Sequence, residues 1–184
     1  MKYLIPALVF MAAVAGAPAL EARQTDTRLD GLFARLHATD NDAEAAGIEA
    51  MIWGIWTAAE DEALDRLMRD GVGAMNSGRF GQALESFNAI IESDPSFAEG
   101  WNKRATVNYL LGNYPGSLYD IERTLNLEPR HFGALSGRGL VLIELDQQGR
   151  ALESFEAALE VYPKLPGASR NAESLRREIQ KHEI

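Results

Sequence analysis

Three prolines divide the second half of this 184-residue chain at a fixed interval. Pro95, Pro129 and Pro163 follow one another 34 residues apart. The pentapeptide Ala-Leu-Glu-Ser-Phe occurs at residues 83–87 and again at 151–155, and the two copies are separated by twice that interval. A period of this length is typical of stacked helical repeats, in which each unit packs against its neighbours. The period therefore predicts a repeat protein rather than a globular enzyme domain.

Each period is expected to contain two helices. In the middle copy an apolar pattern at 101–111 is followed by the turn Gly112-Asn113-Tyr114 and a second apolar pattern at 118–127. The apolar residues of each pattern recur at helical spacing, and Gly112 stands where a first helix would end. Just after Pro95, Ser96 and Glu99 have the spacing of a capping box, in which each side chain bonds the other residue's backbone N–H. Each copy is therefore predicted to be a helical hairpin.

Four sets of equivalent positions repeat through the three copies. The large residue of the first helix is Leu67, Trp101 and Leu135. The small residue four positions later is Gly71, Ala105 and Gly139. In the second helix the small residue is Ala83, Ser117 and Ala151, and the apolar plug is Phe87, Ile121 and Phe155. In these positions the copies resemble the tetratricopeptide repeat, although Asp70, Arg104 and Arg138 stand where that family has a leucine.

The resemblance implies an all-α fold, an α-solenoid of helical hairpins. The three repeats are expected at 64–97, 98–131 and 132–165. Residues 20–63 are expected to form an N-terminal helical hairpin, as a cap or a degenerate repeat, and residues 166–184 a C-terminal capping helix. Two helices cannot bury their own apolar face alone, so small residues let neighbouring helices approach and share a core.

The first 19 residues have the pattern of a secretory signal peptide. Lys2 precedes an apolar run from Tyr3 to Val14, and small residues end in Ala17-Pro18-Ala19. The alternative is a membrane anchor, but the apolar run is shorter than the ~20 residues that a spanning helix needs. We therefore expect cleavage after Ala19 and an exported protein, with no membrane insertion after cleavage.

Composition argues against several classes of function. The chain has no cysteine, which excludes disulfides and thiol chemistry. Its net charge of −9 disfavours binding to nucleic acid. His37, His131 and His182 lie in different segments without metal-ligand spacing, and no catalytic or phosphate-binding motif is present. We expect no metal, no cofactor and no catalytic residues.

The resemblance also implies a partner-binding groove. In the family the first helix of each repeat lines the concave face, which holds an extended peptide or a partner helix. Carried over by position, the expected groove residues are Met68, Val72, Met75, Asn102, Thr106, Tyr109, Ser136, Leu140 and Ile143. A basic rim is expected beside them at Lys103, Arg104 and His131, suited to an acidic partner segment. The alternative is that these basic residues pair with neighbouring glutamates.

Two tryptophans stand three residues apart in the expected N-terminal hairpin. Trp53 and Trp56 could form a ligand-stacking surface, but we expect them to pack in the core against the next hairpin.

These patterns predict a non-catalytic protein–protein interaction module of the cell envelope. Exported repeat proteins of this size resemble those of Gram-negative bacteria, so the periplasm is the expected compartment and a protein or peptide the expected partner. The alternative is a periplasmic chaperone or assembly factor with many clients, for which the adaptable Met68 and Met75 would be suited. A cryptic enzyme is the least favoured class.

Overall fold

The computed structural model describes residues 25–59 and 61–182, and this part of the chain is helical without strands. The helices are α1 (Arg28–Ala38), α2 (Asp42–Thr57), α3 (Glu62–Asn76), α4 (Phe80–Ser93), α5 (Ala98–Leu110), α6 (Tyr114–Leu127), α7 (Phe132–Glu144), α8 (Gln148–Val161) and α9 (Pro166–His182). The predicted all-α solenoid is confirmed. The predicted signal peptide lies outside the described residues.

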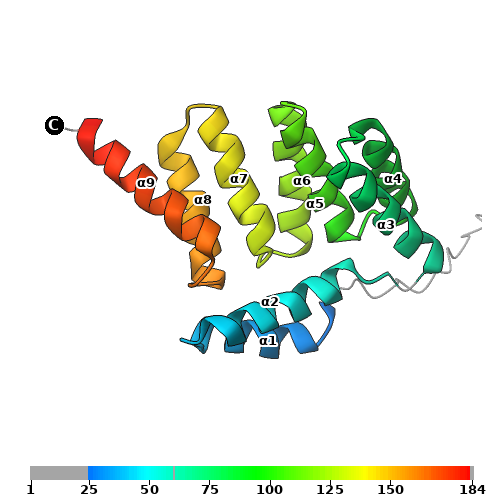
Figure 1. Ribbon diagram of the computed structural model, residues 1–184, viewed down its shortest axis with the longest axis horizontal. Coiled ribbons are helices and arrows are strands. Elements are labelled where there is room, and N and C mark those ends of the chain that lie inside the picture. The colour runs from blue at the N-terminus through cyan, green and yellow to red at the C-terminus, as the bar shows by residue number, and fades with distance from the viewer. Residues whose placement is uncertain (1–24, 60, 183–184) are drawn as a thin grey trace, which may run out of the picture.

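Three helical hairpins form the body of the molecule. They are α3 with α4, α5 with α6 and α7 with α8, and α9 packs on α8 at the C-terminal end (Figure 1). The cap α9 contributes Ala168, Ala172 and Leu175 to the core that α7 and α8 share. Its opposite face carries charged side chains, so the last hairpin is covered by an amphipathic helix.

Small and large residues are matched at the crossing of the two helices in each hairpin. A Cβ added at Gly71 would lie 2.6 Å from a ring carbon of Phe87, and one at Gly139 would lie 2.6 Å from a ring carbon of Phe155. In the middle hairpin the plug is the smaller Ile121, and Ala105 takes the place of glycine. Glycine therefore occurs where the opposing plug is a phenylalanine ring.

The turn inside each hairpin repeats with the same period. Gly78 and Gly112 have positive φ angles of 72° and 73°, and Asp146, at the equivalent position of the third hairpin, has φ 56°. Glycine adopts this left-handed conformation without steric cost, and Asp tolerates it better than most residues. The turn thus ends each first helix and reverses the chain.

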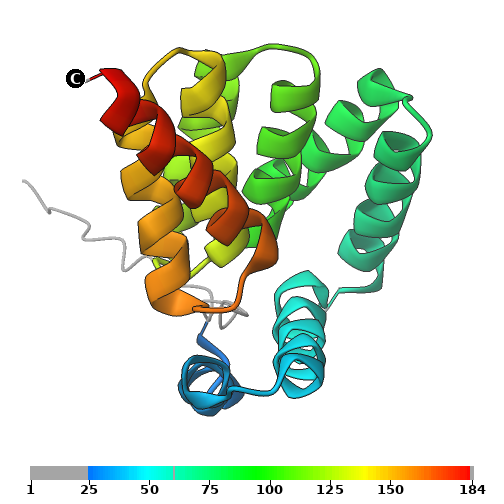
Figure 2. The ribbon, with the colours of Figure 1, turned by 60° about the vertical axis from the view of Figure 1, so that its left-hand side comes forward.

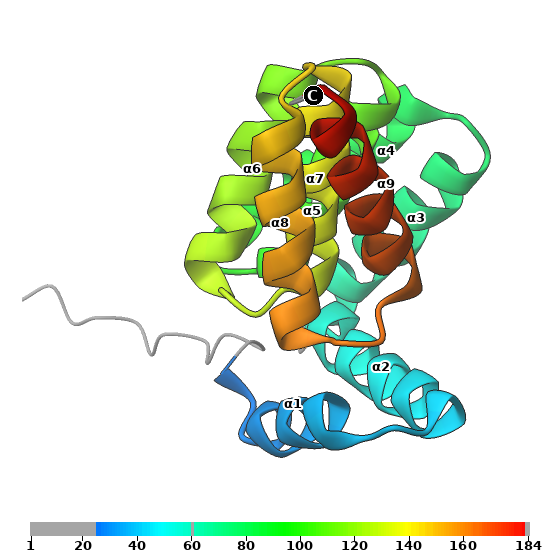
Figure 3. The ribbon, with the colours of Figure 1, turned by 90° about the vertical axis from the view of Figure 1, so that its left-hand side faces the viewer.

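The N-terminal hairpin does not continue the stack beside α3. Helices α1 and α2 lie across the ends of the later helices, beneath α5, α7 and α8 in Figure 1 and Figure 3. Their core joins Ile52 and Trp56 of α2 to Phe132 at the start of α7 and Tyr162 just after α8. The hairpin is therefore a bridge across the second and third repeats.

Within the described residues, none of the helices is both long and apolar enough to cross a membrane.

Candidate functional site

The first helices of the repeats lie on the inner side of the bend. In Figure 2 and Figure 3, α6 and α8 lie on the outside, and α5 and α7 lie between them and α9. The predicted groove residues that keep part of their surface exposed here are Val72, Met75, Thr106, Tyr109, Ser136, Leu140 and Ile143. We call this set the inner face. Leu140 is 37% exposed and is the most accessible apolar member of this set.

Two of the predicted groove residues are buried instead. Met68 is 5% exposed and belongs to the core of the first hairpin. Asn102 is 7% exposed, and its Nδ2 donates to Oε2 of Glu99 at 3.0 Å. Neither side chain is positioned to contact a partner directly.

A tyrosine pair and one carboxylate form the far end of the inner face. The Tyr114 hydroxyl donates to Oε2 of Glu144 at 3.1 Å, and the rings of Tyr109 and Tyr114 lie 6.1 Å apart. Partial burial, and then the neighbouring Glu144 carboxylate, raise the pKa of Tyr109. The hydrogen bond to Glu144 is the main cause that raises the pKa of Tyr114. This end therefore offers uncharged phenols around a single anion.

At the other end of the inner face, a carboxylate and an imidazole are fully buried against each other. Oε2 of Glu99 lies 3.0 Å from Nε2 of His131, and both side chains are 0% exposed. Nδ1 of His131 accepts from the backbone N–H of Ala134 at 3.0 Å, so it caps the N-terminus of α7. The ring hydrogen is therefore on Nε2, which donates to Glu99.

Lys103 supplies the positive charge that balances the Glu99 carboxylate. Its Nζ lies 2.8 Å from Oε1 of Glu99, one helical turn away, and its side chain is 20% exposed. Burial alone would raise the pKa of Glu99, but the His131 hydrogen bond and the charge of Lys103 outweigh it, so the pKa is lowered. Glu99 is accordingly a buried anion held by the Lys103 ammonium and by hydrogen bonds from His131 and Asn102.

The two tryptophans of the N-terminal hairpin pack against His131 and Lys103. Trp56 stacks on His131 with ring centroids 4.1 Å apart and planes 9° from parallel. Trp53 meets the edge of the same imidazole at 5.4 Å, and Nζ of Lys103 lies 5.0 Å from the centroid of its ring. We call these five residues, Trp53, Trp56, Glu99, Lys103 and His131, the junction. Both tryptophans were expected to pack in the core against the next hairpin. Trp56 is in the core, but it packs at the start of α7 in the third repeat rather than on α3 and α4, and Trp53 is only partly buried.

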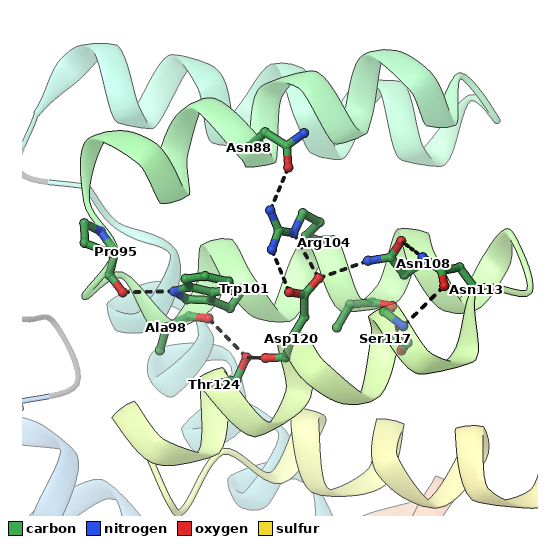
Figure 4. Close-up of polar contacts among 12 residues, drawn as sticks. Asn88, Pro95, Ala98, Trp101, Arg104, Asn108, Asn113, Ser117, Asp120 and Thr124 are labelled. Atoms are coloured by element: carbon green, nitrogen blue, oxygen red, sulfur yellow. Dashed lines mark hydrogen bonds and ion pairs between the residues drawn. The ribbon is translucent and has the colours of Figure 1, made fainter.

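The predicted basic rim requires correction. His131 is inside the protein rather than on a rim. The guanidinium of Arg104 forms two bonds to the Asp120 carboxylate, at 2.7 and 2.9 Å, and a third to Asn88 at 2.7 Å (Figure 4). Asn108 donates to the same carboxylate at 3.0 Å (Figure 4). Arg104 therefore links α4, α5 and α6 instead of facing a ligand.

Other basic residues near the expected rim also have partners within the chain. Arg130 pairs with Glu128 at 3.0 Å and with Asp30 of α1 at 2.6 Å. Nε of Arg138 donates to Oγ of Ser154 at 3.0 Å. The alternative interpretation, pairing with neighbouring glutamates, agrees with Lys103 on Glu99 and Arg130 on Glu128. The partners of Arg104 and Arg138 are Asp120 and Ser154 instead.

The capping box predicted at Ser96 and Glu99 is wrong. Helix α5 begins at Ala98, and no side chain caps its N-terminus. Ser96 Oγ instead donates to Asp94 at 2.6 Å, and the Glu99 carboxylate is turned inward to His131. The sequence showed no local signal for this pairing, because His131 is 32 positions further along the chain.

A second concavity lies away from the inner face. A hollow of about 490 Å³ separates α2 from the connection between α8 and α9, with Asp42, Glu49, Tyr162 and Lys164 among its walls. Lys164 is paired with Asp42 at 2.7 Å. Across residues 25–59 and 61–182, no group of three or more acidic or histidine side chains is arranged to hold a metal ion.

Comparison with known proteins identifies the family. The sequence profile of the tetratricopeptide repeat matches residues 71–125. A tetratricopeptide repeat-containing protein of Rhizobium etli is 38% identical over 136 residues, which are 74% of this chain and 67% of the relative. The chain belongs to the tetratricopeptide repeat family.

Solved tetratricopeptide repeat structures share the fold at low sequence identity. The first such domain of Spaghetti (RPAP3), bound to an HSP90 peptide, has a TM-score of 0.62 and 19% identity, and covers 67% of this chain and 98% of that domain. The type III secretion chaperone SycD of Yersinia enterocolitica, with a peptide of the translocator YopD, has a TM-score of 0.60 and 13% identity, and covers 65% of this chain and 96% of that chain. Each match leaves about one third of this chain outside the shared fold.

Proposed function

We propose that this tetratricopeptide repeat protein is an exported, non-catalytic interaction module that binds a peptide or helix of a partner protein on its inner face. The observation that carries the proposal is the accessible strip formed by Val72, Thr106 and Leu140 on successive first helices, in which two apolar side chains flank one hydroxyl. An accessible, mostly apolar strip of this kind is typical of protein-binding surfaces. Two structural neighbours hold peptides, which supports the same use of the fold.

The proposal also includes export of the protein and a location in the cell envelope. They are supported by the signal-like residues 1–19. The mass of the purified protein from its native host tests this part. A mature N-terminus at residue 20 and recovery with periplasmic markers are expected, whereas an uncleaved chain in the cytoplasmic fraction would contradict it.

Photocrosslinking tests the binding surface. A photoreactive residue is placed in turn at Tyr109 and at Leu140 on the inner face, and at Tyr119 as the control. Tyr119 is 57% exposed on α6, so it is more accessible than Tyr109 or Leu140 and burial cannot explain a lack of adducts there. Adducts of one mass are expected from the two inner positions and none from Tyr119. Equal adducts from all three positions would show that capture is unspecific.

A chaperone with many clients is the second candidate. The adaptable Met75 is partly exposed on the inner face, and a type III secretion chaperone shares the fold. The buried position of Met68 removes the other methionine from this argument. A ladder of adducts from Tyr109 would favour this candidate, and a single band would favour one dedicated partner.

A further inference from the structure

The two tryptophans of the junction have different surroundings. Trp56 is 2% exposed and belongs to the core that holds the hairpin to α7. Trp53 is only partly buried, at the surface where α2 meets α5 and α7. Trp56 therefore fixes the hairpin in place, whereas Trp53 covers one end of the inner face.

The repeats make a shaped seat for the Trp53 ring. A Cβ added at Gly133 would lie 2.8 Å from Cη2 of Trp53, so a larger residue in the first turn of α7 would collide with the indole. Phe132 and His131 present their rings edge-on to it, with centroids 5.5 and 5.4 Å away. The Lys103 ammonium lies near its face at 5.0 Å. We call the space bounded by Lys103, His131, Phe132 and Gly133 the aromatic socket.

The polar group of Trp53 does not tie it to the repeats. Its Nε1 donates at 3.3 Å to Glu49, which is on the same helix. The contacts that hold Trp53 are therefore those of its ring, with the socket and with Trp56 at 5.3 Å.

The socket is continuous with the inner face along two helices. Thr106 follows Lys103 by one turn of α5, and Leu140 follows Gly133 by two turns of α7. Both belong to the inner face, where Thr106 is partly exposed and Leu140 is exposed. A segment lying on the inner face would therefore pass directly beside the socket.

We propose that the aromatic socket is a subsite for an aromatic side chain of the partner, and that Trp53 occupies it as an intramolecular ligand which the partner displaces. This inference rests on the proposed function of the inner face. The bound ring would take the place of the indole beside the Lys103 ammonium, which favours tryptophan over smaller rings. The partner segment is thus one with an exposed tryptophan, tyrosine or phenylalanine.

The test uses the full chain and two labelled heptapeptides that differ at one position. One peptide is Ser-Gly-Ser-Trp-Ser-Gly-Ser and the other has alanine in place of tryptophan. Binding is followed by NMR from the backbone amides of Lys103 and Gly133. In the Trp53→Ala variant the tryptophan peptide is expected to bind about tenfold more tightly than in the unaltered chain, because the competitor is gone. The alanine peptide is expected to bind neither protein.

A second substitution keeps the test specific to the socket. Adding Gly133→Leu to the Trp53→Ala chain fills the vacated space, and the gain in affinity is expected to disappear. Tyr119→Ala, on α6 and not part of the inner face, is the control that should leave binding unchanged. If Trp53→Ala does not fold, Trp53→Leu keeps an apolar cover with a shorter reach and is used instead.

Two results would overturn the inference. One is equal affinity of the tryptophan peptide for the altered and unaltered chains, and the other is binding that survives Gly133→Leu. Crosslinking from Tyr109 and Leu140 distinguishes this failure from failure of the proposed function. Adducts at those positions with an unresponsive socket remove only the socket, whereas an absence of adducts removes the inner-face proposal itself.

Discussion

At the scale of single residues, the buried Glu99 is the most demanding feature of the molecule. A carboxylate without solvent must be compensated, and it is held here by His131 at 3.0 Å and Lys103 at 2.8 Å. Each of the three residues has a second role. Glu99 accepts from Asn102, His131 caps α7, and Lys103 faces the Trp53 ring. Glu99, His131 and Lys103 together therefore join α5, α7 and α2.

Replacing Glu99 by glutamine should destabilise the fold strongly. Glu99→Gln keeps the size of the side chain but leaves Lys103 without its counter-charge, so we expect a loss of about 3 kcal/mol in the free energy of unfolding. Urea denaturation measures it. The matched control is Glu62→Gln, which removes an exposed partner of Arg66 at 3.5 Å and should change stability little. Equal effects of the two substitutions would contradict a structural role for the buried pair.

The same residue predicts a difference in pH dependence. Because the folded-state pKa of Glu99 is below its ordinary value of 4.5, the unfolded chain takes up the proton first as the pH falls. Its stabilising contribution is therefore complete above that value and is lost as the pH falls through the folded-state pKa. Urea titrations from pH 7 to pH 3 should show the stability gap between the unaltered chain and Glu99→Gln narrowing only in the acid range. A constant gap throughout would rule this out.

At the scale of helices, the crossing of each hairpin depends on the pairing of a small residue with its plug. The Gly71–Phe87 and Gly139–Phe155 contacts leave no space for a methyl group, whereas the Ala105–Ile121 pair admits one. The exchange of glycine plus phenylalanine for alanine plus isoleucine keeps the local volume similar.

Two glycines of α3 provide a matched test of this packing. Gly71→Ala should cost about 1–3 kcal/mol, because the new methyl group meets the Phe87 ring. Gly73→Ala, two residues away on the same helix, meets nothing within 4 Å and should instead stabilise the protein by about 0.5–1 kcal/mol. Thermal and urea unfolding report both values. The interpretation fails if the two substitutions change stability in the same direction.

At the scale of the whole molecule, the N-terminal hairpin is joined to distant parts of the chain. Its core includes Phe132 and Tyr162, and Arg130 reaches Asp30 of α1 at 2.6 Å. His37 bonds the backbone carbonyl of Glu160 at 3.1 Å. These contacts attach the N-terminal hairpin to the end of the second repeat and to the third repeat.

This attachment predicts a single cooperative unfolding transition. Trp53 and Trp56 report on the hairpin, whereas far-UV circular dichroism is dominated by the helices of the repeats. Because the hairpin shares its core with the third repeat, both signals should change at the same urea concentration. Trp101→Phe removes the one tryptophan of the repeats from the fluorescence signal. A fluorescence transition at lower urea than the dichroism transition would mean that the hairpin melts independently.

The placement of the hairpin also divides the predicted groove. At one end Lys103 lies against Trp53 of α2, and the end with Tyr109, Leu140 and Ile143 is partly exposed. A partner is therefore expected to bind the exposed end first and to reach the end at Lys103 only by displacing Trp53.

The amino-acid sequence by itself determined the repeat body of this protein. The 34-residue period, the small residue at each crossing and the plug opposite it are all local patterns, because a hairpin brings together residues of one unit. The expected groove residues came instead from the family resemblance, position by position, and the burial of Met68 and Asn102 removes two of them.

Only the tertiary structure decided where the N-terminal hairpin lies and what Glu99 does. Trp56 meets His131 across 75 positions of chain, and Glu99 meets the same ring across 32. Neither contact repeats with the period, so no pattern in the sequence marks it. Such contacts arise when separately formed units dock, and burial of apolar surface at the docking site then selects which charges are enclosed.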